Sequence, residues 1–210
     1  MNVYIWTSGE LKNAYIGEYT GRLPSTYQEV EYIWNSWTQY IDTGYYPNDK
    51  TTVQAKFIYT NYSWGLLLGG GTSSEADQLK LFRYQNNTYL DYGSWDRYNR
   101  IYGSYITSTT DIYEVEFGNR YVKDIPTDTV KISWSTVSFS AKSYTFKILY
   151  VGRDFAKMYY VKIYDNWTLV RDFVPCYRKS DNVIWMYDLV NKQFYTNAWS
   201  GTFTKWNDVN

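Results

Sequence analysis

Apolar and polar residues alternate one by one in several segments of the chain. Val53, Ala55 and Phe57 alternate with the polar Gln54 and Lys56. The same period of two recurs in the apolar Tyr113, Val115 and Phe117, which alternate with Glu114 and Glu116. Because successive side chains of a strand point to opposite faces, this pattern predicts antiparallel strands with one face in a core and the other toward solvent.

Further strand-like segments follow at a spacing of roughly ten residues, with turn residues between them. They cover residues 29–33, 39–42, 79–84, 88–92, 130–133, 144–151, 158–164, 169–173 and 183–187. Helical stripes of apolar residues are hard to find. So many short strands predict an all-β protein built as a jelly-roll-like sandwich of two antiparallel sheets.

A boundary near residues 21–24, marked by glycine and proline, separates a short lead-in from the rest of the chain. Within the lead-in, residues 3–7 and 14–19 are predicted to be strands, with a turn at Ser8 and Gly9. We therefore expect residues 1–22 to form a lead-in hairpin or connector and residues 23–210 to form one sandwich domain. A chain of 210 residues is long enough to bury a substantial core.

Composition removes several classes of function. Basic and acidic residues number 21 each, and this balance argues against a nucleic-acid partner bound through phosphate neutralisation. The absence of histidine excludes Ser-His-Asp and Cys-His catalysis and histidine-containing zinc sites. The single cysteine, Cys176, is expected to be an inert buried thiol. No apolar run reaches transmembrane length and no basic and apolar leader follows Met1, so we expect neither membrane insertion nor an ordinary signal peptide.

Two stretches near the ends of the main segment carry a more specific signal. The first reads Leu-Pro-Ser-Thr-Tyr-Gln-Glu-Val-Glu-Tyr-Ile at 23–33 and continues as Thr-Gln-Tyr-Ile-Asp-Thr-Gly at 38–44. The second reads Val-Arg-Asp-Phe-Val-Pro-Cys-Tyr-Arg-Lys-Ser at 170–180, then Tyr-Asp-Leu-Val-Asn at 187–191 and Phe-Tyr-Thr-Asn at 194–197. Together they resemble the opening and closing strands of the concanavalin A-like (laminin G-like) jelly-roll domains of phage tail, tail-fibre and baseplate proteins and of bacterial surface proteins.

This resemblance implies two curved sheets that serve mostly to bind glycans or protein receptors. It implies a non-catalytic adhesion domain in the virion, on a phage or prophage tail appendage, or at a cell surface. The expected partners are a cell-surface glycan or protein receptor, other tail proteins and further copies of the chain. A purely structural virion protein without receptor contact is the alternative, and a glycoside hydrolase is a more distant third.

Calcium is the one cofactor that the resemblance leaves open, because laminin G-like domains sometimes bind it through aspartate side chains and backbone carbonyls. The acids near predicted loops are Asp42, Asp49, Asp91 and Asp96. No spacing typical of a calcium loop connects them. No other cofactor is expected.

Tryptophan stands where a sandwich of this kind is expected to have glycine. Between the strands predicted at 158–164 and 169–173, Asp165-Asn166-Trp167-Thr168 forms a hairpin connection in which Asn-Gly would be the usual turn. Tryptophan has a steric cost at positive φ that glycine avoids. Similar contexts, from turn chemistry or from the family pattern, surround nine of the ten tryptophans: Trp34, Trp37, Trp64, Trp95, Trp134, Trp167, Trp185, Trp199 and Trp206.

Three interpretations of these tryptophans stay open. The first is that the nine positions are UGA codons that the source organism reads as glycine and that are written here as tryptophan. The second is that the tryptophans are genuine and mostly structural, and the third is that several form a sugar-stacking platform. Peptide mass spectrometry on native material separates the first from the others, because glycine and tryptophan differ greatly in mass.

The segment from 84 to 105 is the strongest candidate for ligand binding. It combines tyrosine, asparagine and arginine, a mixture that recognition surfaces favour because it supplies stacking area and adaptable hydrogen bonds. The ligand-binding residues expected here are Tyr84, Tyr89, Tyr92, Arg97, Tyr98, Asn99 and Arg100. The alternative is that the tyrosines only cover the sheets, half-buried with their hydroxyls in water.

Two pairs of charged residues complete the candidates. Glu114 and Glu116 are predicted on one strand face and come nearest to the paired carboxylates of a glycosidase, but the further acid of sandwich-fold glucanases is missing. A solvated strand face is the simpler interpretation. Arg178 and Asp188 flank a predicted hairpin, and we expect them to form a partly buried ion pair that fixes the closing strands, with ligand contact as the alternative.

Overall fold

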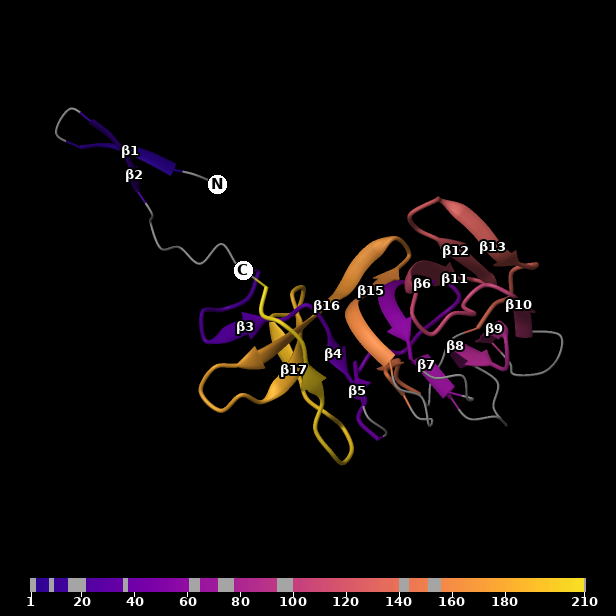
Figure 1. Ribbon diagram of the computed structural model, residues 1–210. Helices are drawn as coiled ribbons and strands as arrows, with labels where there is room; N and C mark the ends of the chain where they lie inside the picture. The colour runs from indigo at the N-terminus through magenta and orange to yellow at the C-terminus, as the bar shows by residue number, and fades with distance from the viewer. Residues whose placement is uncertain are drawn as a thin grey trace.

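The computed structural model shows an all-β protein of two antiparallel sheets with an additional N-terminal hairpin, and this confirms the predicted fold class (Figure 1). The structure describes residues 3–7, 10–14, 22–35, 38–60, 65–71, 78–93, 100–139, 144–150 and 156–209, and for the first two ranges it describes the strands alone. None of the described residues is helical. The prediction from alternation is therefore confirmed at the level of fold.

The lead-in forms a two-stranded sheet of its own. β1 (Val3–Thr7) pairs with β2 (Glu10–Ala14) in antiparallel register, so that Thr7 lies opposite Glu10 and Val3 opposite Ala14. The strand predicted at 3–7 is present. Its partner runs from Glu10 to Ala14, and residues 15–19 of the second predicted strand lie outside the described residues.

The smaller sheet of the sandwich has six strands in the order β10-β9-β8-β7-β14-β5. These strands are β5 (Ile41–Asp42), β7 (Gly65–Gly70), β8 (Gln78–Tyr84), β9 (Asn87–Gly93), β10 (Arg100–Gly103) and β14 (Lys147–Ile148). β8, β9 and β10 are consecutive in the chain and form a meander at one edge of this sheet.

The larger sheet has eleven strands, of which eight follow the order β13-β12-β11-β6-β15-β16-β17-β18. The short β4 pairs with β15 and β19, and β3 pairs with β16. The bounds are β3 (Tyr27–Glu29), β4 (Ile33–Trp34), β6 (Thr51–Tyr59), β11 (Ile112–Gly118), β12 (Tyr121–Asp124), β13 (Thr129–Ser133), β15 (Ala156–Asp165), β16 (Thr168–Arg178), β17 (Ile184–Asp188), β18 (Gln193–Tyr195) and β19 (Thr204–Lys205).

The main core lies between the two sheets and is built by the apolar positions of the alternating segments. Val53, Ala55 and Phe57 of β6 are fully buried, as are Val115 and Phe117 of β11. From the smaller sheet, the core receives Ile41, Leu68, Leu79, Leu81, Leu90, Tyr92 and Ile148. Burial of these side chains is the largest favourable contribution to the fold.

A second hydrophobic cluster lies on the other face of the larger sheet. It contains Leu23, Val174, Cys176 and Tyr187, with Tyr27, Trp185, Leu189 and Phe194 packed against it. Phe173 belongs to the main core, whereas its neighbour Val174 belongs to this second cluster, so β16 is buried on both faces. Figure 1 shows β3 and β17 of this region at one end of the body and β8, β9 and β10 at the other.

The hairpin between β15 and β16 has the geometry that its sequence predicted. Asn166 and Trp167 both have positive φ, 47° and 66°, between the last pair of β15 and β16 at Asp165 and Thr168. A two-residue connection with positive φ at both positions is a type I′ turn, for which Asn-Gly is the preferred sequence. Trp167 occupies the glycine position of this turn, and 76% of its surface is exposed.

The other tryptophans of the described ranges do not share this strain. Among the residues described, Trp167 is the one tryptophan with positive φ. Trp34, Trp134, Trp199 and Trp206 are exposed, and Trp185 is half-buried with an indole N–H that lacks a hydrogen-bond partner. Trp37, Trp64 and Trp95 lie outside the described residues. Among the tryptophans whose side chains are described, only Trp185 packs against a hydrophobic cluster, and it does so half-buried.

The predicted ion pair between Arg178 and Asp188 is wrong. Asp188 lies opposite Phe173 in the register of β16 and β17, five residues before Arg178, so about 16 Å of strand separates them. Asp188 is fully buried, and its carboxylate lies 3.5 Å from Nε of Arg171. Arg178 instead donates from Nε to Asp181 in the adjacent turn at 2.9 Å.

Candidate functional site

The segment predicted to bind ligand forms the edge meander of the smaller sheet. Tyr89 and Arg100 lie on the face turned away from the main core, because their strand neighbours Leu90 and Ile101 are core residues. Tyr84 ends β8 on the same face, where its ring contacts Tyr89. Tyr92 points the opposite way and is fully buried, so its predicted role in binding is wrong. Arg97, Tyr98 and Asn99 lie outside the described residues.

Three aromatic rings form a row across the meander on this outer face. Strand register places Tyr102 of β10 opposite Tyr89 of β9, and Tyr89 opposite Phe82 of β8. The ring centroids of Tyr102 and Tyr89 are 5.4 Å apart with planes inclined by 24°, and those of Tyr89 and Phe82 are 5.2 Å apart with planes inclined by 14°. Cross-strand neighbours of this kind stabilise the sheet and hold the rings in one orientation.

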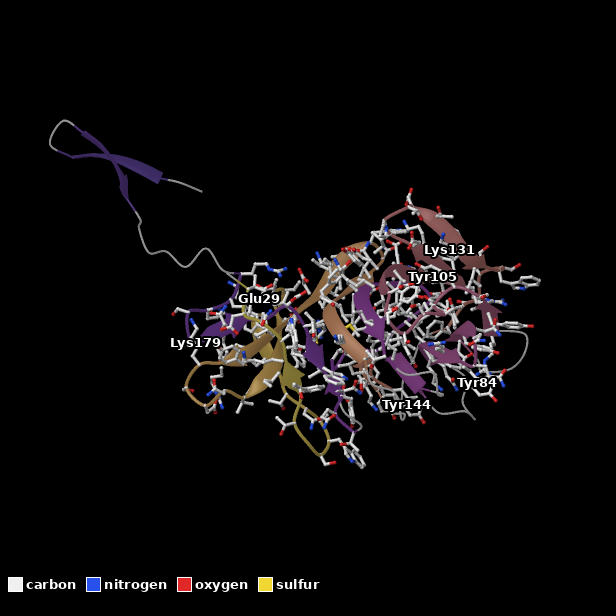
Figure 2. All side chains as sticks on the ribbon, viewed as in Figure 1. Glu29, Tyr84, Tyr105, Lys131, Tyr144 and Lys179 are labelled. Carbon is white, nitrogen blue, oxygen red and sulfur yellow. The ribbon has the colours of Figure 1, made fainter. Side chains whose placement is uncertain are left out.

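Tyr84 extends the row into a small surface. Its ring meets the ring of Tyr89 edge-on, with centroids 6.2 Å apart. Tyr102 is 64% exposed, Tyr84 is 44% exposed and Tyr89 is half-buried between them. Figure 2 shows Tyr84 at the opposite end of the body from Glu29 and Lys179. We call Tyr84, Tyr89 and Tyr102 the tyrosine platform.

The hydroxyl groups of the platform are not used by the fold. Within the described part of the chain, the hydroxyls of Tyr84, Tyr89 and Tyr102 make no hydrogen bond. The two nearby tyrosines of the segment behave differently. Tyr92 donates to the backbone carbonyl of Asn48 or Thr51, each 3.0 Å away, and Tyr105 donates to Asp124 at 2.6 Å.

An ion pair between Arg100 and the buried Asp91 lies beside the rings of the tyrosine platform. Asp91 is only 1% exposed and accepts two hydrogen bonds from Arg100, from Nε at 2.6 Å and from Nη2 at 2.8 Å. The guanidinium carbon of Arg100 lies 5.1 Å from the ring centroid of Phe82 and 5.6 Å from that of Tyr89. A guanidinium held at two points in this way supports the rings as a rigid layer.

Burial sets the protonation behaviour of this pair. Burial raises the pKa of the Asp91 carboxyl, and the hydrogen bond and charge of Arg100 oppose that shift. The hydrogen bond from Asp91 raises the pKa of Arg100, so the guanidinium stays charged.

Sequence reasoning identified part of this site and missed the rest. The sequence pattern predicts a strand at 79–84 but gives Phe82 no role in binding, and it names Asp91 only as a candidate calcium ligand. Alternation held the missing signal, because Tyr89 and Asp91 share one face of β9 while Leu90 and Tyr92 share the other. Tyr92 could have been removed from the binding residues by the same argument.

The paired glutamates lie on the outer face of the larger sheet and are fully engaged there. Glu114 accepts a hydrogen bond from the hydroxyl of Tyr160 at 2.8 Å, and Lys56 lies 3.6 Å away. Glu116 accepts hydrogen bonds from Gln54 and Tyr121 and lies 3.3 Å from Lys123. Burial alone would raise the pKa of Glu116, but these partners outweigh it and lower the pKa.

Cys176 and the acids proposed for calcium are in unreactive settings. Cys176 is buried in the second hydrophobic cluster, and burial raises the pKa of its thiol to about 12. Asp42 accepts from the backbone N–H of Gly44, and Asp49 accepts from Ser138. Asp96 lies outside the described residues. In the ranges that the structure describes, no three carboxylate, cysteine or histidine side chains gather as metal ligands.

An open pocket lies away from the platform, beside the β15–β16 hairpin. Its lining consists of Asn48, Asp49, Lys50, Phe139, Asp165, Asn166, Thr168 and Val170. The side chain of Asn48 donates to Asp165 at 3.1 Å, and Ser138 donates to Asp49 at 2.7 Å. Three polar side chains of its lining are thus bound to neighbours.

Comparison with known proteins does not assign the chain to a family. No family model matches the chain, and no curated protein matches it either. Among the described residues, no helix is long and apolar enough to span a membrane.

Proposed function

We propose that the protein is a non-catalytic carbohydrate- or receptor-binding domain of the concanavalin A-like type, carried by a phage or prophage tail appendage. The tyrosine platform is the observation that carries this proposal. It offers exposed rings fixed in orientation and hydroxyls that the described fold leaves without a partner. The resemblance of the first and last strands to adhesion domains supports the same function.

The chemistry of the platform suits a sugar ring. The face of an aromatic ring carries negative potential, and the C–H groups on one face of a pyranose are weakly positive. A sugar can therefore lie flat on the exposed ring of Tyr102 while its hydroxyl groups exchange hydrogen bonds with the hydroxyls of the platform. Tyrosine provides this contact area at a low entropic cost, because few side-chain torsions have to be fixed.

The charge state of the paired glutamates argues for binding and against glycoside hydrolysis. A glycosidase needs one carboxylic acid with a raised pKa that can protonate the leaving group. The pKa of Glu116 is lowered, and Glu114 lies beside Lys56. Glu116 therefore lacks the raised pKa of a general acid, and Glu114 is occupied by Tyr160 and Lys56.

The test is a glycan-array screen of the full chain, with and without calcium. Tyr102→Ala is expected to abolish specific binding, because it removes the most exposed ring of the platform. Tyr46→Ala is the matched control, since Tyr46 is 52% exposed and lies outside the platform. A folded protein that binds no glycan, or that loses nothing with Tyr102→Ala, would contradict the proposal and favour a structural role in the virion.

A further inference from the structure

The open pocket beside the β15–β16 hairpin is lined by two apolar residues of the core and six polar residues. Phe139 belongs to the main core, and Val170 packs against that core. The polar lining residues are Asn48, Asp49, Lys50, Asp165, Asn166 and Thr168. The pocket has a volume of about 650 Å³, within the range of small-molecule sites, which combine apolar walls with a few placed polar groups.

Hydrogen bonds between three segments hold the lining of this pocket in place. The side chain of Asn48 donates to the carboxylate of Asp165 at 3.1 Å, which connects the loop before β6 to the hairpin. The backbone N–H of Asp49 donates to the carbonyl oxygen of Phe139 at 2.9 Å. Because the three segments are already joined, a ligand has to order little of the chain when it binds.

Part of the polar lining has hydrogen-bonding capacity that the described fold does not use. The side chains of Lys50, Asn166 and Thr168 are exposed and make no hydrogen bond or ion pair within the described residues. An ammonium group donates, and an amide and a hydroxyl both donate and accept. Asp49 and Asp165 add carboxylates in which one oxygen is bound by a described side chain. This mixture of donors and acceptors suits a ligand whose own hydroxyl groups both donate and accept.

Trp167 lies in the chain between two lining residues of the pocket, Asn166 and Thr168. Its φ of 66° has a steric cost, and 76% of its surface is exposed. Among the described residues, its side chain makes no hydrogen bond, ring contact or cation–π contact. The fold therefore gains little from this side chain in return for the strain. Backbone strain of this kind is concentrated at functional sites, where a ligand can compensate for it.

From the pocket and the turn beside it, we infer that this end of the hairpin is a second carbohydrate site, in which Trp167 stacks on a sugar ring and the polar lining binds the sugar hydroxyls. The negative face of an indole attracts the weakly positive C–H groups of a pyranose. The site is separate from the tyrosine platform and does not depend on it. It requires tryptophan, rather than glycine, at position 167 of the native protein.

The test titrates the full chain with the methyl glycosides of glucose, galactose, mannose and N-acetylglucosamine, and with tetramethylammonium as a cationic probe, followed by NMR. Trp167→Gly is expected to weaken glycoside binding about tenfold and to raise the melting temperature, because it removes both the ring and the strain. A variant that melts higher and binds less has not lost binding through misfolding. Trp134→Gly is the matched control, since Trp134 is 68% exposed at ordinary φ and does not line the pocket.

A second variant tests the polar lining. Lys50→Gln removes an exposed ammonium group that has no hydrogen bond or ion pair within the described residues. It should weaken glycoside binding several-fold and leave the melting temperature unchanged. Unchanged binding in this variant would overturn the role of the lining.

The outcomes distinguish this site from the tyrosine platform. Glycoside binding that is weakened by Trp167→Gly, and not by Trp134→Gly or Tyr102→Ala, supports the inference. Binding that is lost in Tyr102→Ala and unchanged in Trp167→Gly overturns the inference and leaves the proposed function in place. Preference for tetramethylammonium overturns a sugar as the ligand, and glycine at position 167 in peptides of native material overturns the role of the ring. Binding of no saccharide by the folded chain overturns both proposals.

Discussion

The outer faces of the two sheets both carry tyrosines, but they use them differently. On the larger sheet, Tyr121, Tyr160 and Tyr164 donate to Glu116, Glu114 and Gln54 at 2.9, 2.8 and 3.2 Å. On the smaller sheet, the hydroxyls of the tyrosine platform bind nothing within the described residues. A tyrosine whose hydroxyl is bound internally stabilises its sheet, whereas one whose hydroxyl is left over can bind something else.

Charged residues are paired on the outer faces of both sheets. On the larger sheet, cations and carboxylates of neighbouring strands neutralise one another, as Lys162 does with Asp172 and Lys123 with Glu116. On the smaller sheet, Arg100 pairs with Asp91 beneath the tyrosine platform. The two faces therefore differ in how they use their tyrosines rather than in whether their charges are paired.

The largest effect is expected at the ion pair beneath the platform. Asp91→Asn removes the charge that holds Arg100, and we expect a loss of about 3 kcal/mol in the free energy of unfolding together with loss of glycan binding. Denaturant unfolding measures the first and glycan titration the second. The control is Asp181→Asn, since the pair of Asp181 with Arg178 is exposed and should contribute no measurable stability. Equal effects of the two variants would mean that Asp91 is not a structural support.

Removal of single tyrosine hydroxyls tests the comparison directly. Tyr102→Phe and Tyr89→Phe should weaken glycan binding several-fold without changing stability, because they remove a hydroxyl that the described fold does not use. Tyr121→Phe should do the reverse and lower the free energy of unfolding by about 1 kcal/mol, since Glu116 loses a donor. Binding affinity and denaturant midpoints of the three variants are the measurements. A shift of stability at Tyr102 or of binding at Tyr121 would remove the distinction between the faces.

At the β15–β16 turn of the larger sheet, we expect a substitution to increase stability by a similar amount. Trp167→Gly should stabilise the protein by about 1 kcal/mol, because glycine adopts positive φ without the steric cost that tryptophan has there. In a chain of this length, the melting temperature should rise by about 3 °C. Trp134→Gly is a suitable control, since Trp134 is exposed at ordinary φ. If both variants lose stability, the turn does not prefer glycine.

The smallest effect on stability is expected when the pH is lowered and Glu116, on the outer face of the larger sheet, becomes protonated. The pKa of Glu116 is lowered in the folded protein, so its contribution to stability is present above the pKa of an unfolded glutamate and is lost as the pH falls through the folded value. Because burial of Glu116 opposes the effect of its partners on the pKa, the loss should stay below about 1 kcal/mol. Glu116→Gln should flatten the dependence of the unfolding free energy on pH between neutral and acidic conditions. An unchanged slope in this variant would assign acid sensitivity to other carboxyls.

Much of the fold could be predicted because its strands obey a local rule. Alternation identified β6 and β11 and the faces of their side chains, and turn chemistry identified the Asn166-Trp167 connection. The same rule, applied residue by residue, would have placed Phe82 and Asp91 beside Tyr89 and excluded Tyr92. The positions of Phe82, Asp91 and Tyr92 could thus have been predicted from alternation alone.

Other features depend on register, which alternation does not give. The expected pair of Arg178 with Asp188 failed because β17 begins at Ile184, which places Asp188 opposite Phe173. Likewise, β14 is inserted next to β7 in the smaller sheet, although it is far from it in the chain. Sequence position alone cannot show which strands become neighbours in a sheet.

The burial of β16 on both faces connects the two hydrophobic clusters through one strand. Phe173 anchors one face of the strand in the main core, and Val174 and Cys176 anchor the other face in the second cluster. A shift of β16 along its neighbours would remove side chains from both clusters at once. The main core and the second cluster should therefore unfold as one cooperative unit rather than one after the other.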